Sequence, residues 1–296
     1  MSNAASDLFE LINFFVLGNY QAAINEGVSF GTGQLREGDL VLRDFYVYRS
    51  YIAQGNYQLV LSEIKDNAPA ALQIVKLLAT YSYREEAKDG IVNALKEWMK
   101  DGVRANDPLQ QLIAATIFFA HGNLQDALRC VHQSSNIECL ALLAQIYLRI
   151  NRLDLASKEM RRMEQTDDDH TLTQLTRAWV GIAEGGEKVE EAVQTLTTLS
   201  ERYGSSATLL NGLGVAALQQ QQFGEAEQCF LRALEKKPSD TDAISNLITT
   251  YSHQNKSSEV IQRQLNQLAS ISPQHPTLTS RAALEDQFDR LQKQFA

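Results

Sequence analysis

The sequence contains few of the residues that interrupt helices. Its 296 residues include only 5 prolines and 16 glycines, and apolar–polar alternation with a period of two is hard to find. A β-sheet protein needs that alternation and frequent turn residues, so both shortages argue against one. The hydrophobic fraction of 44% and the charged fraction of 21% are those of a globular chain and not of a disordered one. The sequence therefore predicts an all-α protein.

Cysteine and basic residues are also scarce. The three cysteines are an odd number and form no CxxC pair, so we expect buried thiols in a reducing compartment rather than a disulfide framework. Lys and Arg number 27 against 36 Asp and Glu, which gives a net charge of −9. This balance argues against nucleic acid and anionic lipid as partners, because both are bound through clusters of basic side chains.

Long apolar runs are missing as well. No run of 18 apolar residues exists, so no segment is expected to insert into a membrane. The first apolar run, residues 8–17, contains Glu10 and Asn13 and has no basic lead, so a signal peptide is not expected. We therefore expect a cytoplasmic protein that reaches a membrane only through a partner.

Motifs that mark catalytic or metal sites give little signal. The five histidines stand apart, and no HExxH sequence occurs. The glycines of residues 27–38 lack the lysine of a phosphate-binding loop, and we expect no serine at a nucleophile elbow. A Ser/His/Asp triad can assemble from distant residues, which the sequence leaves open. Our expectation is a protein that is not an enzyme and has no catalytic residue, cofactor or metal site.

A repeated helix pair is the strongest positive signal, and residues 207–240 show it most clearly. Two helical faces there carry small and large apolar residues, and Pro238 ends the second one: Leu210, Leu213, Gly214 and Ala217, then Phe223, Ala226, Phe230, Ala233 and Leu234. Small residues let the two backbones approach closely while the large ones fill the space around the contact. This pattern resembles the tetratricopeptide repeat, two antiparallel helices with a period of about 34 residues.

Weaker copies of this pattern run through the chain. The turn sequence Gly18-Asn19-Tyr20 recurs at residues 55–57 and is echoed at 122–124. The anchor residues of successive second helices, at positions 127, 156, 192, 226 and 260, lie 29, 36, 34 and 34 residues apart. We expect one domain over residues 1–296, a tetratricopeptide-like helical-pair solenoid with an irregular right-handed superhelix. At Gly185-Gly186 the turn is longer, and we expect a local change of curvature there.

The two ends of the chain carry separate expectations. Residues 1–6 are small and polar and are expected to be disordered. Residues 276–296 follow Pro273 and Pro276 and present apolar residues with spacings of 4, 3 and 4: Leu284, Phe288, Leu291 and Phe295. Because the open end of a solenoid needs a cover, this amphipathic stretch is predicted to be a C-terminal capping helix.

A solenoid of helix pairs offers a concave groove lined by the first helices. Counting outward from the core positions gives these candidate groove residues for a partner: Phe45, Arg49, Ile52, Leu112, Thr116, Phe119, Gln145, Leu148, Arg149, Asn211, Val215 and Leu218. Several are apolar, which favours a hydrophobic partner. If the phase of the count is off by one residue, they are core residues instead. Only Arg49 and Arg149 are basic, so a clamp for a carboxylate is disfavoured.

Six stretches go beyond the repeat pattern and carry a family resemblance. They are LFELINFFVLGNYQAAINE (8–26), RDFYVYRSYIAQGNYQLVLSEI (43–64), GGEKVEEAVQTL (185–196), LLNGLGVAALQQQQFGEAEQCFLRAL (209–234), SNLITTYS (245–252) and HPTLTSRAALEDQFDRL (275–291). Together they resemble the epsilon subunits of coatomer, the COPI vesicle coat, over nearly the whole chain.

That resemblance implies a non-catalytic structural subunit whose groove binds and stabilises the C-terminal domain of the coatomer alpha subunit. It implies other coatomer subunits as further partners, a peripheral place on Golgi and COPI vesicle membranes, and a role in Golgi-to-ER and intra-Golgi transport. The alternative from another class is a cytosolic tetratricopeptide co-chaperone adaptor that binds peptide tails. A hydrolase is a third class, and it requires a pocket with a polarised nucleophile.

Overall fold

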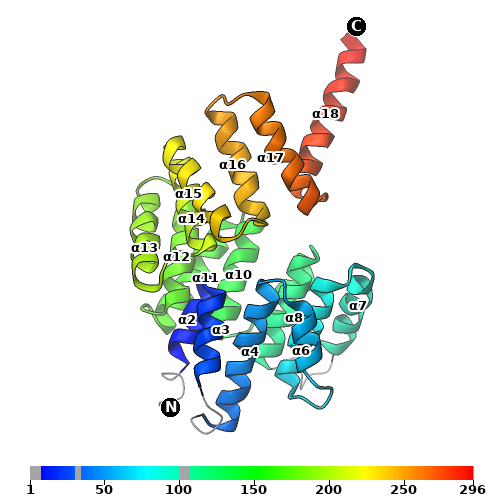
Figure 1. Ribbon diagram of the computed structural model, residues 1–296, viewed down its shortest axis with the longest axis vertical. Coiled ribbons are helices and arrows are strands. Elements are labelled where there is room, and N and C mark those ends of the chain that lie inside the picture. Colours follow the sequence, from blue (N-terminus) through cyan, green and yellow to red (C-terminus); the bar gives the residue numbers. More distant parts are fainter. Residues whose placement is uncertain (1–7, 31–34, 101–106, 296) are drawn as a thin grey trace. The chain divides into compact units, whose positions relative to one another are not determined.

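The computed structural model describes residues 8–30, 35–100 and 107–295, and these residues form helices joined by short turns (Figure 1). No strand occurs within these three ranges. The all-α, tetratricopeptide-like prediction is therefore confirmed. Residues 1–6, which we expected to be disordered, lie outside the described ranges.

The helices follow the predicted order of pairs, and one helix remains at the C-terminus. Their bounds are α2 (Phe9–Val16), α3 (Tyr20–Ser29), α4 (Glu37–Ala53), α5 (Tyr57–Glu63), α6 (Ala70–Tyr83), the 3₁₀ turn η1 (Glu85–Ala87), α7 (Lys88–Trp98), α8 (Pro108–Ala120), α9 (Leu124–Val131), α10 (Ile137–Arg149), α11 (Leu153–Thr166), α12 (Thr171–Glu184), α13 (Glu187–Tyr203), α14 (Ala207–Gln219), α15 (Phe223–Lys236), α16 (Thr241–His253), α17 (Ser258–Ile271) and α18 (Pro276–Phe295). We call the even-numbered helices α2 to α16 the first helices.

Six first helices end in the same way. In each of them the residue that follows the C-cap has a positive φ: Gly18, Gly55, Gly122, Asn151, Gln221 and Asn255. In the fourth pair, the N–H of Gly122 donates to the carbonyl of Phe119 at 3.0 Å and the next N–H donates to the carbonyl of Phe118 at 2.8 Å. This Schellman arrangement satisfies carbonyls that the helix end leaves without partners. The Gly-Asn turns of the sequence are thus left-handed helix ends, and three pairs form the same end without glycine.

The chain divides into two compact units, residues 1–184 (unit 1) and 185–296 (unit 2). The boundary falls at Gly185 and Gly186, whose φ angles are +79° and +59° and which join α12 to α13. This is the position where the longer turn predicted a change of curvature. One continuous domain and a right-handed superhelix both stay predictions.

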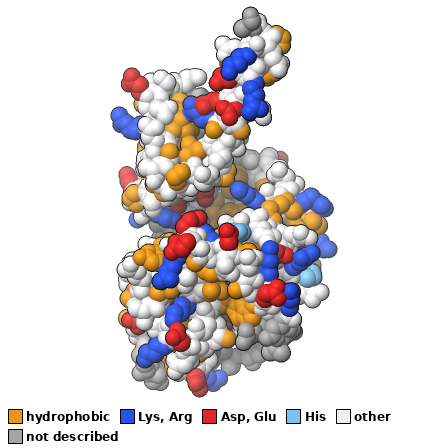
Figure 2. Space-filling model, turned by 90° about the vertical axis from the view of Figure 1, so that its right-hand side faces the viewer, with side chains coloured by type: hydrophobic (Ala, Val, Ile, Leu, Met, Phe, Trp, Pro, Cys, Tyr) orange, Lys and Arg blue, Asp and Glu red, His pale blue; other side chains and the backbone are white. Residues whose placement is uncertain are grey.

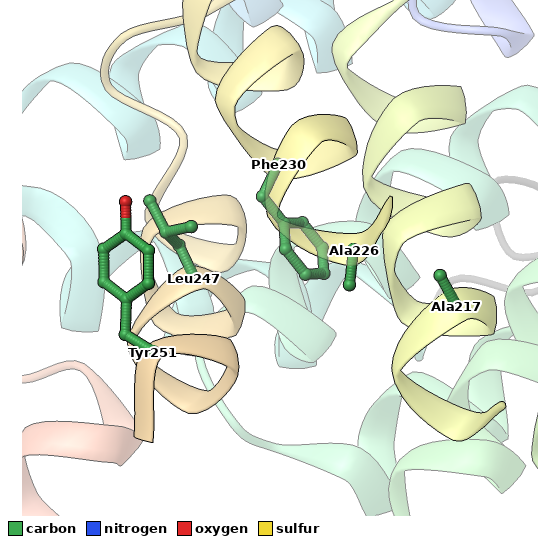
Figure 3. Close-up of a cluster of buried hydrophobic side chains, with 5 residues drawn as sticks. All are labelled: Ala217, Ala226, Phe230, Leu247 and Tyr251. Atoms are coloured by element: carbon green, nitrogen blue, oxygen red, sulfur yellow. The ribbon is translucent and has the colours of Figure 1, made fainter. Parts of the chain in front are cut away.

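Unit 2 is held together by apolar layers. The ring of Phe230 is fully buried between α14, α15 and α16, together with Ala226 and Leu247 (Figure 3). A Cβ atom placed on Gly214 would lie 2.5 Å from Cε1 of this ring. Only glycine therefore allows α14 and α15 to approach this closely, as the sequence pattern indicated.

In unit 1 the row of first helices returns on itself. Each first helix from α2 to α12 contacts the next one, and α2 also contacts α12 (Figure 1). Helices that are more than 150 residues apart in the chain therefore pack side by side. This closure brings the inward side chains of α4 and α10 together in the middle of the unit.

The C-terminal helix α18 begins at Pro276, as predicted, but none of its side chains is buried. The four apolar residues that we expected to cover the array are exposed: Leu284 by 65%, Phe288 by 69%, Leu291 by 53% and Phe295 by 89%. The predicted helix is present, while its apolar face does not cover unit 2 in this structure. The reason is geometric, because the apolar stripe starts only in the third turn of the helix, beyond the side chains of α16 and α17.

Candidate functional site

Three of the predicted groove residues lie in the core of unit 1 instead of on an open surface. Phe45 is 0% exposed, Leu112 4% and Ile52 9%. The first helices that carry them, α4 and α8, each pack against neighbouring first helices, so these side chains are covered by the chain itself. At these three positions the structure agrees with the alternative given above, that the residues belong to the core.

Arg49 was also predicted to face a partner, but it pairs with a residue of its own chain. Its Nη1 donates to Oε2 of Glu138 at 2.9 Å, and the two side chains are only 12% and 10% exposed. The guanidinium carbon lies 4.3 Å from the ring centroid of Phe15 and 4.9 Å from that of Phe45. A buried cation thus has a carboxylate partner and two aromatic faces, the contacts that offset its loss of hydration.

The carboxylate of Glu138 has a second buried partner, because the hydroxyl of Tyr46 donates to its Oε1. Burial in the first place, and the neighbouring Glu138 in the second, raise the pKa of Tyr46 well above its usual value. The hydroxyl therefore stays protonated and keeps donating. Glu138 lies in the first turn of α10, where the N-terminal end of a helix favours a negative charge. The cluster of Tyr46, Arg49 and Glu138 thus joins α4 to α10, two first helices that are not neighbours in the row.

Sequence reasoning missed this cluster. Arg49 and Glu138 are 89 residues apart, and no spacing rule links them. The available signals were weak: an arginine among aromatic residues in α4, and a glutamate just after Asn136, which caps α10 by accepting the N–H of Glu138 at 2.9 Å.

The remaining candidates of unit 1 are at least partly accessible. Thr116, Phe119, Gln145 and Leu148 are partly exposed, and Arg149 is exposed. Phe119 and Leu148 are therefore the large apolar side chains of this set that a partner can reach. With Arg49 occupied by Glu138, Arg149 is the one basic candidate still available, which withdraws support from a carboxylate clamp and hence from the co-chaperone alternative.

The candidates of unit 2 form the border of its core. Val215 and Leu218 are partly buried and pack against the cluster around Phe230. Asn211 accepts a hydrogen bond from Nδ2 of Asn246 in α16 at 3.0 Å, which joins two neighbouring first helices. These residues thus place apolar carbon beside amide groups where α14 adjoins α16.

The cysteines have the environment of structural thiols. Cys130 and Cys139 are buried and free, while Cys229 is only partly buried. Burial raises the pKa of Cys130 to about 12 and that of Cys139 to about 11. Neither thiol forms much thiolate at neutral pH, so neither has the low pKa of a nucleophilic cysteine.

Residues 27–31 have the GxSxG spacing, although we expected no nucleophile elbow. Ser29 ends the helix α3, and its hydroxyl donates to the carbonyl of Glu26 at 2.7 Å. A nucleophile elbow instead places its serine in a strand-to-helix turn. The spacing here therefore belongs to a helix end.

Residues 8–30, 35–100 and 107–295 contain neither a cluster of metal-ligating side chains nor a helix that could span a membrane. Within these ranges no three His, Cys, Asp or Glu side chains come together as a metal site. Over the same part of the chain no helix has both the length and the apolar character needed to cross a bilayer.

A cavity of about 460 Å³ lies where α7, α8 and α9 meet. Its lining combines Phe118 and Cys130 with the basic residues Lys96, Lys100 and Arg129. The carboxylate of Asp126 lies between two of these cations, 3.4 Å from Lys96 and 3.2 Å from Arg129. Much of the local positive charge is therefore neutralised within the chain.

Comparison with known proteins gives a consistent result over the whole chain. The model of the family described as coatomer epsilon subunit matches residues 4–296. Coatomer subunit epsilon-1 of Arabidopsis thaliana is 41% identical over 289 residues, which cover 98% of this chain and 97% of the relative. Coatomer subunit epsilon of Dictyostelium discoideum is 40% identical over 90% of this chain and 91% of the relative, and that of Caenorhabditis elegans is 32% identical over 97% and 98%.

Among solved structures, a chain from the crystal structure of the APC/C hetero-tetramer Cut9-Hcn1 superposes with a TM-score of 0.60. The match covers 94% of this chain and 53% of the other, at 13% sequence identity. At that identity the likeness shows the helical-repeat fold alone.

Proposed function

The chain belongs to the coatomer epsilon-subunit family, and we propose that it is a non-catalytic structural subunit of the COPI coat that binds and stabilises the C-terminal domain of the alpha subunit. The observation that carries this proposal is the family match over residues 4–296, which includes every helix of the array. Membership of a coat family implies other coatomer subunits as partners.

The partner-binding surface of this proposal is the accessible part of the first helices. Phe119 on α8 and Leu148 on α10 supply apolar contact in unit 1, and Val215 and Leu218 on α14 supply it in unit 2. Apolar side chains ringed by polar groups are the usual composition of the centre of a stable protein interface. Through this contact the chain would follow the coat to Golgi and vesicle membranes from the cytoplasm, and it would serve Golgi-to-ER and intra-Golgi transport.

The direct test is a calorimetric titration of the full chain with the purified C-terminal domain of the alpha subunit. We expect Phe119→Ala and Leu148→Asp each to weaken binding at least tenfold, because each removes apolar contact from the proposed surface. Leu59→Asp is the matched control: Leu59 is 40% exposed but lies on α5, a second helix, so its substitution should leave binding unchanged.

Two results would contradict the proposal. A wild-type chain that does not bind this domain excludes the proposed partner. If Phe119→Ala and Leu148→Asp bind like wild type while Leu59→Asp does not, the partner lies on the second helices and the surface is wrongly placed.

A further inference from the structure

The apolar stripe of α18 is the most exposed group of large hydrophobic side chains in the described part of the chain. Leu284, Phe288, Leu291 and Phe295 are spaced by 4, 3 and 4 residues, so they lie along one face of the helix. With exposed fractions between 53% and 89%, they present roughly 500 Å² of apolar side-chain surface, given 150–250 Å² for a fully exposed aromatic residue. The largest contiguous apolar patch on a monomer is often of this size and often functional.

The base of α18 is attached to unit 2. Leu278 packs on the buried cluster of Ile244, Ile248, Leu265 and Leu268, and the hydroxyls of Ser245 and Thr277 lie 2.7 Å apart. His275 also lies 3.7 Å from the carboxylate of Asp242. These contacts involve only the first turn of α18 and the residue before it. The array therefore holds the start of the helix and leaves the stripe from Leu284 onward uncovered.

A second copy of the chain is a poor occupant for this stripe. Two stripes together amount to roughly 1,000 Å², below the 1,200–2,000 Å² that stable interfaces bury. In a pair of helices, opposite charges beside the seam select the partner. The positions beside this seam are mostly uncharged, since three of the four are Gln287, Gln292 and Gln294.

An anionic lipid surface is also a poor occupant. Membrane-surface helices place Lys and Arg on the polar face. The polar face of α18 instead mixes acidic with basic side chains, which appear in red and blue on the C-terminal helix in Figure 2. In the sequence Asp286 and Asp289 are followed by Arg290 and Lys293. Charges of both signs cancel the attraction to phosphate headgroups.

We infer that α18 is a second docking element for the coat partner, and that its stripe is covered by an apolar and largely uncharged surface of that subunit. The inference rests on the proposed function, because the partner is the one named there. A folded domain that covers the stripe can also contact the polar residues beside it and reach the area of a stable interface. The glutamines beside the seam can donate and accept hydrogen bonds at its rim without requiring a charged partner.

The experiment titrates the full chain and three variants with the purified C-terminal domain of the alpha subunit. Leu284→Asp and Phe288→Asp place a charge inside the stripe, and each should raise the dissociation constant at least tenfold. Ala282→Asp is the matched control, because it introduces the same residue into an exposed position on the opposite face of the same helix. Far-ultraviolet circular dichroism checks that all variants keep their helices.

The outcomes separate this inference from the proposed function. If wild type binds and all three variants bind equally well, the docking role of α18 is wrong while the proposed function stands. If wild type does not bind, both fail. Light scattering of the chain alone that shows a dimer lost in Phe288→Asp would assign the stripe to a second copy. Sedimentation with phosphatidylserine vesicles that is lost in Phe288→Asp would assign it to lipid, and either result overturns the inference.

Discussion

The two units of this chain close their cores in different ways. Unit 2 uses apolar layers such as the one around Phe230, built on repeats that lie 34 residues apart. Unit 1 has less regular repeats, its row of first helices closes where α2 contacts α12, and it buries an ion pair between Arg49 on α4 and Glu138 on α10. A regular repeat stacks through neighbouring contacts alone. A row of helices that returns on itself must also join residues distant in sequence, and the hydrogen bonds of Tyr46 and Arg49 to Glu138 are contacts of this kind.

The polar join makes unit 1 sensitive to the loss of a single carboxylate. Glu138→Ala leaves Arg49 buried without its partner and removes the acceptor of Tyr46. We expect a loss of about 3 kcal/mol in the free energy of unfolding of unit 1, since an unpaired buried charge is costly. Urea unfolding followed by hydrogen exchange of the helices α2 to α12 measures it separately from unit 2.

Two further variants show whether burial is the cause. Glu97→Ala removes a pair with Lys100 whose side chains are 73% and 70% exposed, so it should change stability by less than about 0.5 kcal/mol. The double variant Arg49→Leu, Glu138→Leu should recover most of the loss, because it leaves no charge buried. Equal effects of Glu138→Ala and Glu97→Ala would show that burial of the cluster does not stabilise unit 1.

In unit 2 the sensitive feature is close packing. Gly214→Ala places a methyl group 2.5 Å from the Phe230 ring, and overpacking of this kind costs about 2 kcal/mol. The matched control is Gly224→Ala in α15, where the added carbon meets nothing within 4 Å. That variant should be neutral or slightly stabilising, because alanine favours helix. Thermal unfolding that is the same for both variants would contradict the packing of α14 on α15.

The smallest effects are expected at the left-handed helix ends that both units share. Gln221 has a φ of +61°, so Gln221→Gly should stabilise unit 2 by about 1 kcal/mol by removing backbone strain. Gly122 has a φ of +82°, so Gly122→Ala should destabilise unit 1 by about the same amount. Chemical denaturation measures the change in the free energy of unfolding for both variants. A change of the same sign in both would contradict the backbone strain that we assign to a positive φ at these positions.

The sequence predicted the local features well and the long-range ones poorly. The helix pairs, the Gly-Asn turns and the contact of Gly214 with Phe230 follow from spacing within one repeat, where a period of 3.6 residues determines which side chains meet. The contacts across unit 1 do not follow from spacing within one repeat, because Arg49 pairs with a glutamate from another helix pair. For this reason Phe45, Ile52 and Leu112 were expected on an open groove and lie in a core.

The C-terminal helix shows a second limit of the pattern. An amphipathic helix after the last pair predicts that its apolar face is covered, but the pattern does not tell what covers it. In the structure Leu284, Phe288, Leu291 and Phe295 are exposed, so the array itself does not cover them. The sequence thus located the helix correctly and assigned its apolar face to the chain itself.

The most direct test of the account is amide hydrogen exchange of the full chain, alone and with the C-terminal domain of the alpha subunit. We expect slower exchange in the complex in α8 and α10 around Phe119 and Leu148, in α14, and in α18. The second helices α5 and α9 should exchange as before. Slower exchange confined to second helices, or none in any helix, would contradict the account that the first helices and α18 hold the coat partner.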